Sequence, residues 1–281
     1  NILLNMFSFA ADTYVTPSDQ HTDWQDYLLL RSRWWLYARF VRTVFKSRKL
    51  IQENRYNNDN WAQTSFDVMQ AIESVGGRFE ISGIDNLRKA EGPLVIIANH
   101  MSALETFVLP CLVTPIKPTT FVVKEKLMRG VFFGKIMKSR DPIVVGRENA
   151  REDMEIVLRE GEKRLREGKS VILFPEGTRQ ASFIPENFNS LGTKLAKRAG
   201  VKVMPVALKT DFWSNGRFLK GFGPLKRRRR IHIAFGEAMD VEKKEKDRRD
   251  RMNQRVDIIN IRSLEATKSQ SDIIRVLKEQ D

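Results

Sequence analysis

Three short apolar segments of the chain each run into polar residues that could do chemistry. These polar residues are Asn99–Glu105, Gly146-Arg147 and Pro175–Arg179. In an open α/β sheet, ligands bind outside the carboxyl ends of the strands. If the three segments are neighbouring parallel strands, one crevice holds an imidazole, two carboxylates and two guanidinium groups. That set of groups suits general-base chemistry on a phosphorylated substrate.

His100 and Glu105 are the candidates for the base and its orienting acid. They are five residues apart, which on an ideal helix is about 140° and therefore not one face. They can meet only if His100 lies in the turn before a helix and Glu105 lies on its first turns. The change from strand to turn at Ala98-Asn99 predicts that arrangement. Glu105 would then hold one ring nitrogen and leave the other free as a base.

The elements that position these groups are predicted from residue 79 onward, where short apolar strands alternate with helical segments. The predicted strands are 79–82, 94–98, 120–123, 143–145, 171–174, 203–208 and 231–235. A helix is predicted between the fourth and fifth strands, with Met154, Val157, Leu158 and Leu165 at helical spacing. Apolar strands separated by helices predict an α/β fold with a mostly parallel mixed sheet flanked by helices on both faces.

Amphipathic helices are predicted before this sheet. In a helix over residues 24–49 one narrow sector is basic, formed by Arg31, Arg39, Arg42, Lys46 and Lys49. The opposite side is apolar, formed by Trp34, Leu36, Tyr37, Phe40, Val41, Val44 and Phe45. Such a helix either packs its apolar side on the core or lies in a membrane interface. A second amphipathic stretch follows residue 60 and ends at Gly76-Gly77.

Composition limits the class of protein. The 281 residues include 49 Lys and Arg against 35 Asp and Glu, giving a net charge of +14, and 41% are hydrophobic. A disordered or fibrous chain is thereby excluded. No apolar stretch approaches the roughly 18 residues of a membrane-spanning helix. The single Cys111 excludes a disulfide framework and, with only three histidines, a Cys/His zinc site, so no metal is expected.

The basic character predicts an acidic partner. Nucleic acid, an anionic membrane surface and phosphorylated substrates all fit a pI of about 10.0. The cluster Lys226–Arg230 is a solvated loop, a lipid-headgroup contact or a nucleic-acid patch, and a lipid substrate would favour the membrane face. Residues 2–11 are apolar but lack a basic leader, so no export signal is expected.

The polar segments, in this order, resemble the glycerolipid acyltransferase family, which includes the lysophosphatidate acyltransferases. The family's motifs are matched by Asn99, His100 and Glu105; by Ile143–Arg147; by Phe174–Arg179, which reads Phe-Pro-Glu-Gly-Thr-Arg without a change; and by Val203–Val206. The resemblance spans residues 79 to 237. The commoner acid in the first motif is Asp, so Glu105, longer by one methylene, indicates a subgroup.

The resemblance implies roles for individual residues. His100 would act as general base on a glycerol hydroxyl that attacks an acyl thioester, with Glu105 orienting the ring. Arg179, with Arg147 and Lys124, would hold the acceptor phosphate. The remaining contacts to the acceptor would come from Glu176, Gly177 and Thr178. The donor would be acyl-CoA or acyl carrier protein, and no metal or redox cofactor is implied.

The sequence therefore predicts three parts: residues 1–77, an amphipathic helical segment that associates with a membrane; residues 78–240, the catalytic α/β domain; and residues 241–281, a charged helical extension. The expected function is acylation of lysophosphatidate to phosphatidate by a peripheral protein on the cytoplasmic face of a membrane. The acceptor could instead be glycerol-3-phosphate, another lysophospholipid or an amino-acid-containing lyso-lipid. A non-catalytic lipid-binding or nucleic-acid-binding protein is the alternative from another class, and nucleic acid is the less expected partner.

Overall fold

The computed structural model describes residues 11–130, 133–146, 148–180, 189–216, 221 and 223–241. The strands in these ranges are β1 (Tyr14–Val15), β2 (Phe79–Ser82), β3 (Val95–Ala98), β4 (Thr119–Lys124), β5 (Ile143–Val145), β6 (Ser170–Leu173), β7 (Val203–Lys209) and β8 (Ile231–Phe235). The helices are α2 (Trp24–Leu28), α3 (Trp34–Gln52), α4 (Asn58–Glu73), α5 (Ile84–Lys89), α6 (Leu104–Val113), α7 (Glu125–Met128), α8 (Gly134–Lys138), α9 (Ala150–Arg166) and α10 (Leu191–Ala199).

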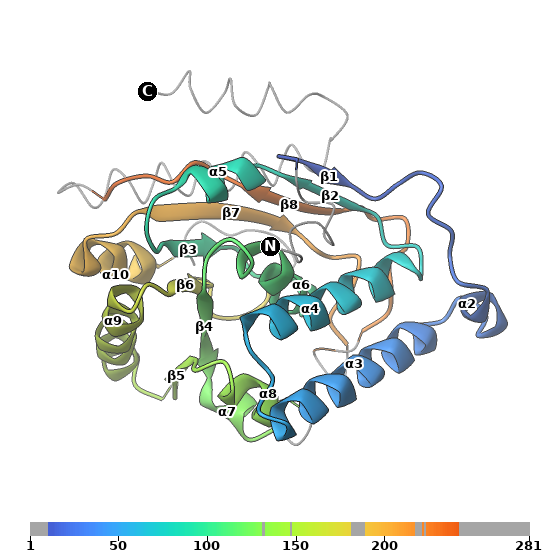
Figure 1. Ribbon diagram of the computed structural model, residues 1–281, viewed down its shortest axis with the longest axis horizontal. Coiled ribbons are helices and arrows are strands. Elements are labelled where there is room, and N and C mark those ends of the chain that lie inside the picture. Colours follow the sequence, from blue (N-terminus) through green and yellow to red (C-terminus); the bar gives the residue numbers. More distant parts are fainter. Residues whose placement is uncertain are drawn as a thin grey trace.

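The described strands form a mostly parallel mixed sheet in the order β1-β2-β8-β7-β3-β6-β4-β5 (Figure 1). Only the pairs β1–β2 and β7–β8 in this sheet are antiparallel. The central strand β3 lies between β6 and β7, and its Val95 is opposite both Val171 and Val203. The predicted α/β fold is confirmed, and each predicted strand is present to within one residue at either end.

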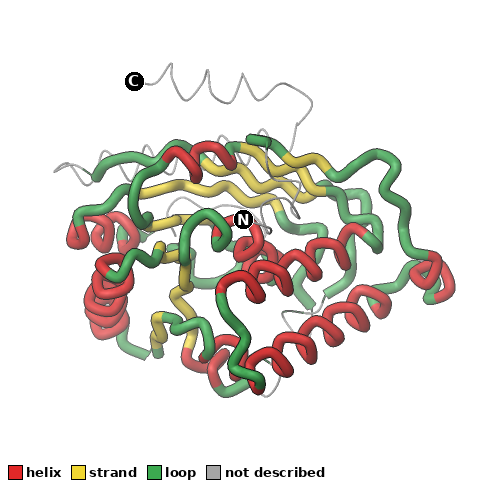
Figure 2. The backbone as a smooth tube through the Cα atoms, viewed as in Figure 1, coloured by secondary structure: helices red, strands yellow, loops and turns green. Residues whose placement is uncertain are grey.

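Helices cover both faces of the sheet, as the two groups of red helices in Figure 2 show. Alternate residues of β3 point to opposite faces: Ile96 and Ala98 pack in the core shared with α4 and α6, and Val95 and Ile97 pack in the core shared with α9 and α10. All four side chains are buried. This two-sided burial explains why the strand reads as an unbroken apolar run.

The prediction of one helix over residues 24–49 is wrong, because the chain breaks it into α2 and α3. Leu30 and Arg31 between them have φ of 53° and 51°. Arg227 holds this break: its guanidinium donates two 2.8 Å hydrogen bonds to the buried Asp26 carboxylate and others to the carbonyls of Arg31 and Ser32. Those carbonyls are therefore not available to a continuous helix. A contact across 201 residues of sequence overrides the local helical pattern.

The apolar side of α3 is partly buried and partly exposed. Leu36, Phe40 and Val44 are buried in the core with α4 and the sheet. Trp34 and Phe45 on the same helix remain 61% and 59% exposed. Packing on the core accounts for only part of the apolar sector, and an exposed apolar stripe remains beside it.

Strand β1 was not predicted. It has only two residues, too few for an alternating pattern, and it pairs with the edge of β2. Its position depends on the buried Glu73 of α4, whose Oε1 accepts hydrogen bonds from Tyr14 at 2.7 Å and Thr16 at 2.6 Å.

The expectation that Lys226–Arg230 faces lipid is wrong for Arg227, which is only partly exposed and pairs with the buried Asp26. Arg229 pairs with Asp211 at 2.6 Å, and Arg230 pairs with Glu80. Part of this basic cluster therefore ties the loop before β8 to the rest of the protein.

Several predictions fall outside the described residues. Arg147 is one of them, and the C-terminal extension lies outside from residue 242 onward, so the three predicted parts of the chain stay a prediction. None of the helices in the described ranges combines the length and apolar character needed to cross a membrane.

Candidate active site

His100 and Glu105 meet at the carboxyl end of β3. His100 lies in the turn after the strand, and Glu105 lies in the first turn of α6. The ring Nδ1 of His100 is 2.9 Å from Oε1 of Glu105, so the predicted contact is present. An ionised carboxylate only accepts hydrogen bonds, so Nδ1 carries a proton, and in the neutral ring Nε2 then keeps its lone pair. The histidine therefore has the tautomer that a general base needs.

The Glu105 carboxylate is completely buried and receives further hydrogen bonds. The backbone N–H groups of Met101 and Ser102 donate to Oε1 at 2.7 and 2.9 Å, and the hydroxyls of Ser102 and Thr210 donate to Oε2 at 2.9 and 2.6 Å. Burial alone would raise the pKa of Glu105, but the bond and charge of His100, the Thr210 hydroxyl and the Ser102 N–H together hold that pKa below its ordinary value. The carboxylate is thus kept ionised within the protein.

The turn that carries His100 is fixed on both sides. The buried Asn99 side chain donates to the carbonyl of Leu208 at 2.9 Å and accepts from its N–H at 2.8 Å, which extends the pairing of β3 with β7. The imidazole stacks on Phe174 with 4.3 Å between ring centroids. These contacts limit the freedom of the ring before any substrate binds.

The hexapeptide Phe174–Arg179 lies directly beside His100. Oε2 of Glu176 accepts a 2.6 Å hydrogen bond from the backbone N–H of His100, and the His100 carbonyl accepts from Gln180 N–H at 2.8 Å. The sequence predicted a substrate contact for Glu176, and the structure gives it a contact with the backbone of the candidate base. Gly177 has φ of 68°, which a residue with a Cβ adopts at a cost.

Arg179 lies near the dyad, the pair His100 and Glu105. Burial lowers the pKa of Arg179, and the negative charge of Glu105 opposes that shift. The guanidinium keeps its charge at neutral pH, as arginine does throughout proteins. Its Nη1 is 3.5 Å from Oδ1 of Asn215, whose amide in turn donates to the carbonyl of Met101 at 3.1 Å. Asn215, which the sequence analysis missed, thus links Arg179 to the turn after His100.

Among the other residues predicted to bind the substrate, Thr178 and Lys124 lie in the described ranges. Thr178 is exposed beside Arg179. Lys124 is the last residue of β4, at the same edge of the sheet as the end of β3, with β6 between the two strands. Arg147 lies outside the described residues, although Gly146 before it is described.

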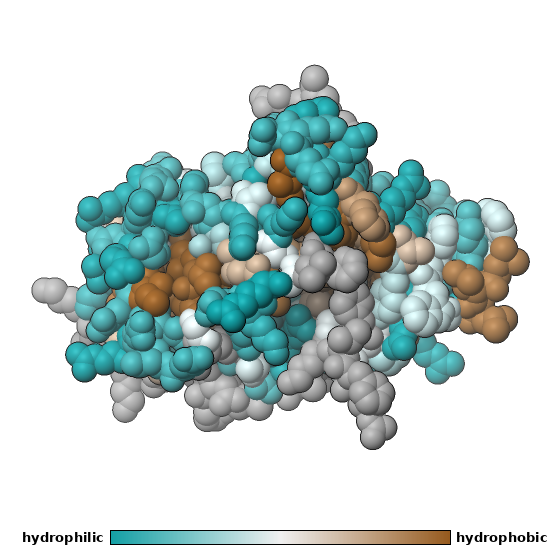
Figure 3. Space-filling model, turned by 90° about the horizontal axis from the view of Figure 1, so that it is seen from below, coloured by the Kyte–Doolittle hydropathy of each residue, from teal (hydrophilic) through white to brown (hydrophobic). Residues whose placement is uncertain are grey.

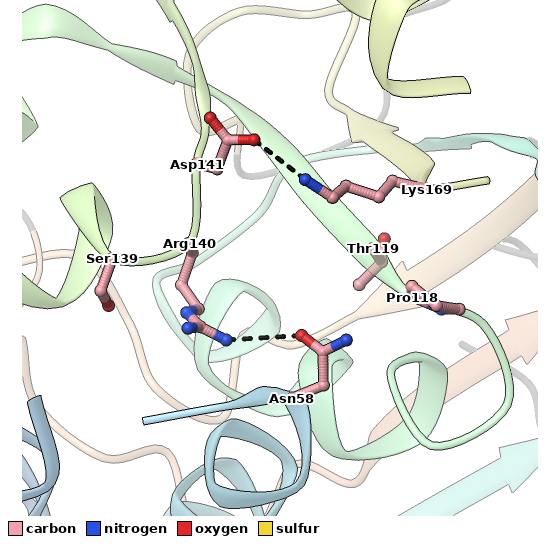
Figure 4. A pocket seen from close by; sticks show the side chains of 7 residues that line it. All are labelled: Asn58, Pro118, Thr119, Ser139, Arg140, Asp141 and Lys169. Atoms are coloured by element: carbon pink, nitrogen blue, oxygen red, sulfur yellow. Dashed lines mark hydrogen bonds and ion pairs between the residues drawn. The ribbon is translucent and has the colours of Figure 1, made fainter. Parts of the chain in front are cut away.

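A cavity of about 140 Å³ lies at the amino ends of the strands, and Figure 4 shows its lining side chains. His100, in contrast, follows the carboxyl end of β3. The cavity is lined by residues at the amino ends of β4, β5 and β6, including Thr119, Asp141 and Lys169. Asp141 already pairs there with Lys169 at 3.0 Å and with Arg164 at 2.7 Å. This cavity is polar and has no connection to the predicted motifs.

The chain is similar to known acyltransferases. Residues 78–209 match the family model described as Acyltransferase. The 1-acyl-sn-glycerol-3-phosphate acyltransferase of Pseudomonas aeruginosa is 28% identical over 220 residues, which cover 77% of this chain and 79% of that protein. A protein of the same description from Chlamydomonas reinhardtii is 29% identical over 171 residues, 61% of this chain and 48% of that protein.

A solved structure supports the fold. The 1-acyl-sn-glycerophosphate (LPA) acyltransferase PlsC of Thermotoga maritima matches with a TM-score of 0.59 and 20% identity, covering 88% of this chain and 95% of that one. A histidine held by a buried carboxylate at the carboxyl edge of such a sheet is typical of enzymes that use a general base. Residues 78–209 are therefore an acyltransferase domain, and the relatives described above support the glycerolipid acyltransferase family.

Proposed function

We propose that the protein transfers a fatty acyl group from an acyl thioester to the free hydroxyl of lysophosphatidate (1-acylglycerol-3-phosphate) and so forms phosphatidate. The names of the relatives from Pseudomonas aeruginosa and Chlamydomonas reinhardtii support this acceptor. The observation that carries the proposal is the 2.9 Å contact between His100 Nδ1 and the buried Glu105 carboxylate. It provides an oriented base without requiring a covalent protein nucleophile.

In this mechanism Nε2 of His100 removes the proton from the acceptor hydroxyl as its oxygen attacks the thioester carbonyl. The tetrahedral intermediate then expels the thiol sulfur, which takes the proton from the imidazolium. Glu105 stabilises the positive charge that the ring carries between these two steps. Such a base contributes on the order of 10²–10⁴ to the rate. The thioester is already activated, so the proposed transfer needs no metal or redox cofactor.

Arg179 is the proposed partner of the acceptor phosphate, because a guanidinium fork matches phosphate oxygens. Its position beside the dyad supports this role. Lys124, at the same edge of the sheet, would add positive charge. Arg147 stays a proposed contact of the phosphate. Gly177 and Thr178 would allow the backbone and a hydroxyl to approach the phosphate.

The proposed donor is acyl-CoA or acyl carrier protein. Both are acidic and both occur in the cytoplasm, and a chain with a net charge of +14 would attract either one. Because both proposed donors are cytoplasmic, we propose that the active site faces the cytoplasmic side of the membrane.

Association with the membrane surface follows from the lipid nature of the acceptor. Hydrophobic side chains gather at the end of the molecule occupied by α2 (Figure 3), where Leu28 and Leu30 are 69% and 90% exposed. Trp24 and Trp34 are also exposed, and Arg31 and Arg33 lie between them in sequence. Aromatic and basic residues together suit the headgroup layer of an anionic bilayer. We propose that α2 and α3 contact lipid.

The test is acyl transfer by the purified protein, with labelled acyl-CoA and labelled acyl carrier protein each offered against a panel of acceptors. The panel contains lysophosphatidate, glycerol-3-phosphate, neutral lyso-lipids and an amino-acid-containing lyso-lipid. Preferred transfer to lysophosphatidate is expected. Transfer only to another acceptor would contradict the proposed substrate and keep the chemistry. Absence of transfer to every acceptor, with liposome binding intact, would favour a lipid-binding protein without activity.

A further inference from the structure

The Glu105 carboxylate receives hydrogen bonds from two different parts of the chain. His100, Met101 and Ser102, all within five residues of the acid, supply four of the five donor groups. The fifth donor is the Thr210 hydroxyl, which is 2.6 Å from Oε2 and 105 residues away in sequence. Thr210 is thus the contact that ties the acid to the residues following β7.

Thr210 is well placed for that task. It follows β7 directly, it is fully buried, and it lies one residue beyond the part of the chain that matches the family model. The paired hydrogen bonds between Asn99 and Leu208 fix the end of β7 against the turn that carries His100. The Thr210 hydroxyl is therefore held at a defined distance from the dyad.

The proton of the Thr210 hydroxyl can be assigned from its neighbours. Ser102 Oγ is 2.9 Å from Glu105 Oε2 and 3.0 Å from Thr210 Oγ1, but it has one proton to donate. Thr210 Oγ1 is closer to the carboxylate, at 2.6 Å, and a carboxylate oxygen cannot donate to it. Thr210 therefore donates to Oε2 in either arrangement of the serine proton.

We propose that Thr210 is a positioning residue for the catalytic dyad. Its hydroxyl fixes Oε2 of Glu105, so that Oε1 stays directed at Nδ1 of His100. Glutamate has one more side-chain torsion than aspartate, and the second anchor on Oε2 removes that freedom. The inference rests on the proposed function, because it assigns Thr210 an effect on catalysis through Glu105.

The first experiment compares Thr210→Val with Thr210→Ser under steady-state conditions, using the acceptor that the wild-type protein prefers. Valine keeps the shape and removes the hydroxyl, so kcat should fall about 10- to 100-fold while KM stays close to wild type. Serine keeps the hydroxyl and should retain most of kcat. The control is Thr120→Val, which should leave kcat close to wild type. Thr120 is also fully buried, but its hydroxyl is 3.1 Å from the carbonyls of Arg140 and Asp141, at the far edge of the sheet.

A double-mutant cycle separates positioning from general destabilisation. In a Glu105→Gln background, the further change Thr210→Val should lower kcat by less than about twofold, because the group it acts through is already lost. A loss as large as that in the wild-type background would overturn the proposal. Equal kcat for the wild type and Thr210→Val would overturn it as well.

A readout without substrate distinguishes this claim from the proposed function. Imidazole ¹⁵N spectra of the wild type and of Thr210→Ser should show His100 protonated at Nδ1, and Thr210→Val should show a mixture of tautomers. An unchanged tautomer in Thr210→Val would contradict the proposal. If the wild type acylates none of the acceptors, the proposed function fails and the tautomer comparison still tests Thr210.

Folding is checked by thermal unfolding of each variant. If Thr210→Val does not fold, Thr210→Ala replaces it in the comparison with Thr210→Ser. Alanine and serine differ only by the hydroxyl. Equal activity of the alanine and serine variants would then contradict the role of the hydroxyl.

Discussion

Shortening the acid of the dyad is the most informative change at this site. Glu105→Asp keeps the charge and withdraws the carboxylate by up to about 1.5 Å, one carbon–carbon bond. The Nδ1–Oε1 distance of 2.9 Å would then approach about 4.4 Å, beyond hydrogen-bond reach. The bond from Thr210, now 2.6 Å, would be lost with it, because it reaches the same carboxylate from β7.

The expected size of the effect follows from these contacts. A hydrogen bond to a charged group contributes about 1.5–3 kcal/mol, so loss of the bond to His100 should lower kcat about 10- to 100-fold. KM for the acceptor should change little, because Glu105 is completely buried and the proposed phosphate contacts lie elsewhere. The assay is steady-state acyl transfer from acyl-CoA or acyl carrier protein to the preferred acceptor.

The control for this change is Glu155→Asp, the same shortening at an exposed position of α9, which should leave kcat unaltered. Thermal unfolding confirms that both variants fold. If Glu105→Asp kept more than about a third of the wild-type kcat, the distance argument would be refuted, since that corresponds to less than 1 kcal/mol.

Three further predictions concern other parts of the molecule. Arg179→Ala should raise KM for phosphate-bearing acceptors more than for neutral ones, and equal effects on both would count against its phosphate role. Arg227→Ala should lower the free energy of unfolding in urea by about 3–5 kcal/mol, because Asp26 would remain as a buried unpaired charge, while the exposed neighbouring change Arg228→Ala should have little effect. Leu30→Asp should weaken sedimentation with anionic liposomes about tenfold or more, from the lost burial of one leucine, and unchanged binding would argue against lipid contact by the segment between α2 and α3.

Much of the sheet could be predicted from sequence because its strands carry a strong signal. β3 and β6 are buried on both faces, so each appears as a short continuous apolar run bounded by polar residues. The polar residues after these runs share an edge once the strands are parallel neighbours. The contact between His100 and Glu105 could be predicted for the same reason, since it depends only on a local change from strand to helix.

The features that were missed depend on contacts between distant parts of the chain. The break between α2 and α3 is held by Arg227, and nothing in the local periodicity of residues 24–49 indicates it. Thr210 had no signal in sequence either, because a threonine after a strand is common and its partner is 105 residues away. Glu176 was assigned to the substrate from its motif, whereas its carboxylate contacts the backbone of His100.

The hexapeptide Phe174–Arg179 contacts the segment that carries His100. Glu176 and Gln180 hold the N–H and carbonyl of His100, and Phe174 stacks on its ring. A change in the hexapeptide can therefore disturb the base without touching the acceptor. Kinetic effects at Glu176 should be interpreted with that contact in mind.

The proposed mechanism depends on His100 as the general base. The most direct measurement is kcat for acyl transfer to the preferred acceptor by His100→Ala, compared with the wild type under saturating donor. We expect a loss of at least about 100-fold in a variant that unfolds at a temperature close to the wild type. Turnover above about a tenth of wild type would contradict it, because a base of this kind contributes more than that to the rate.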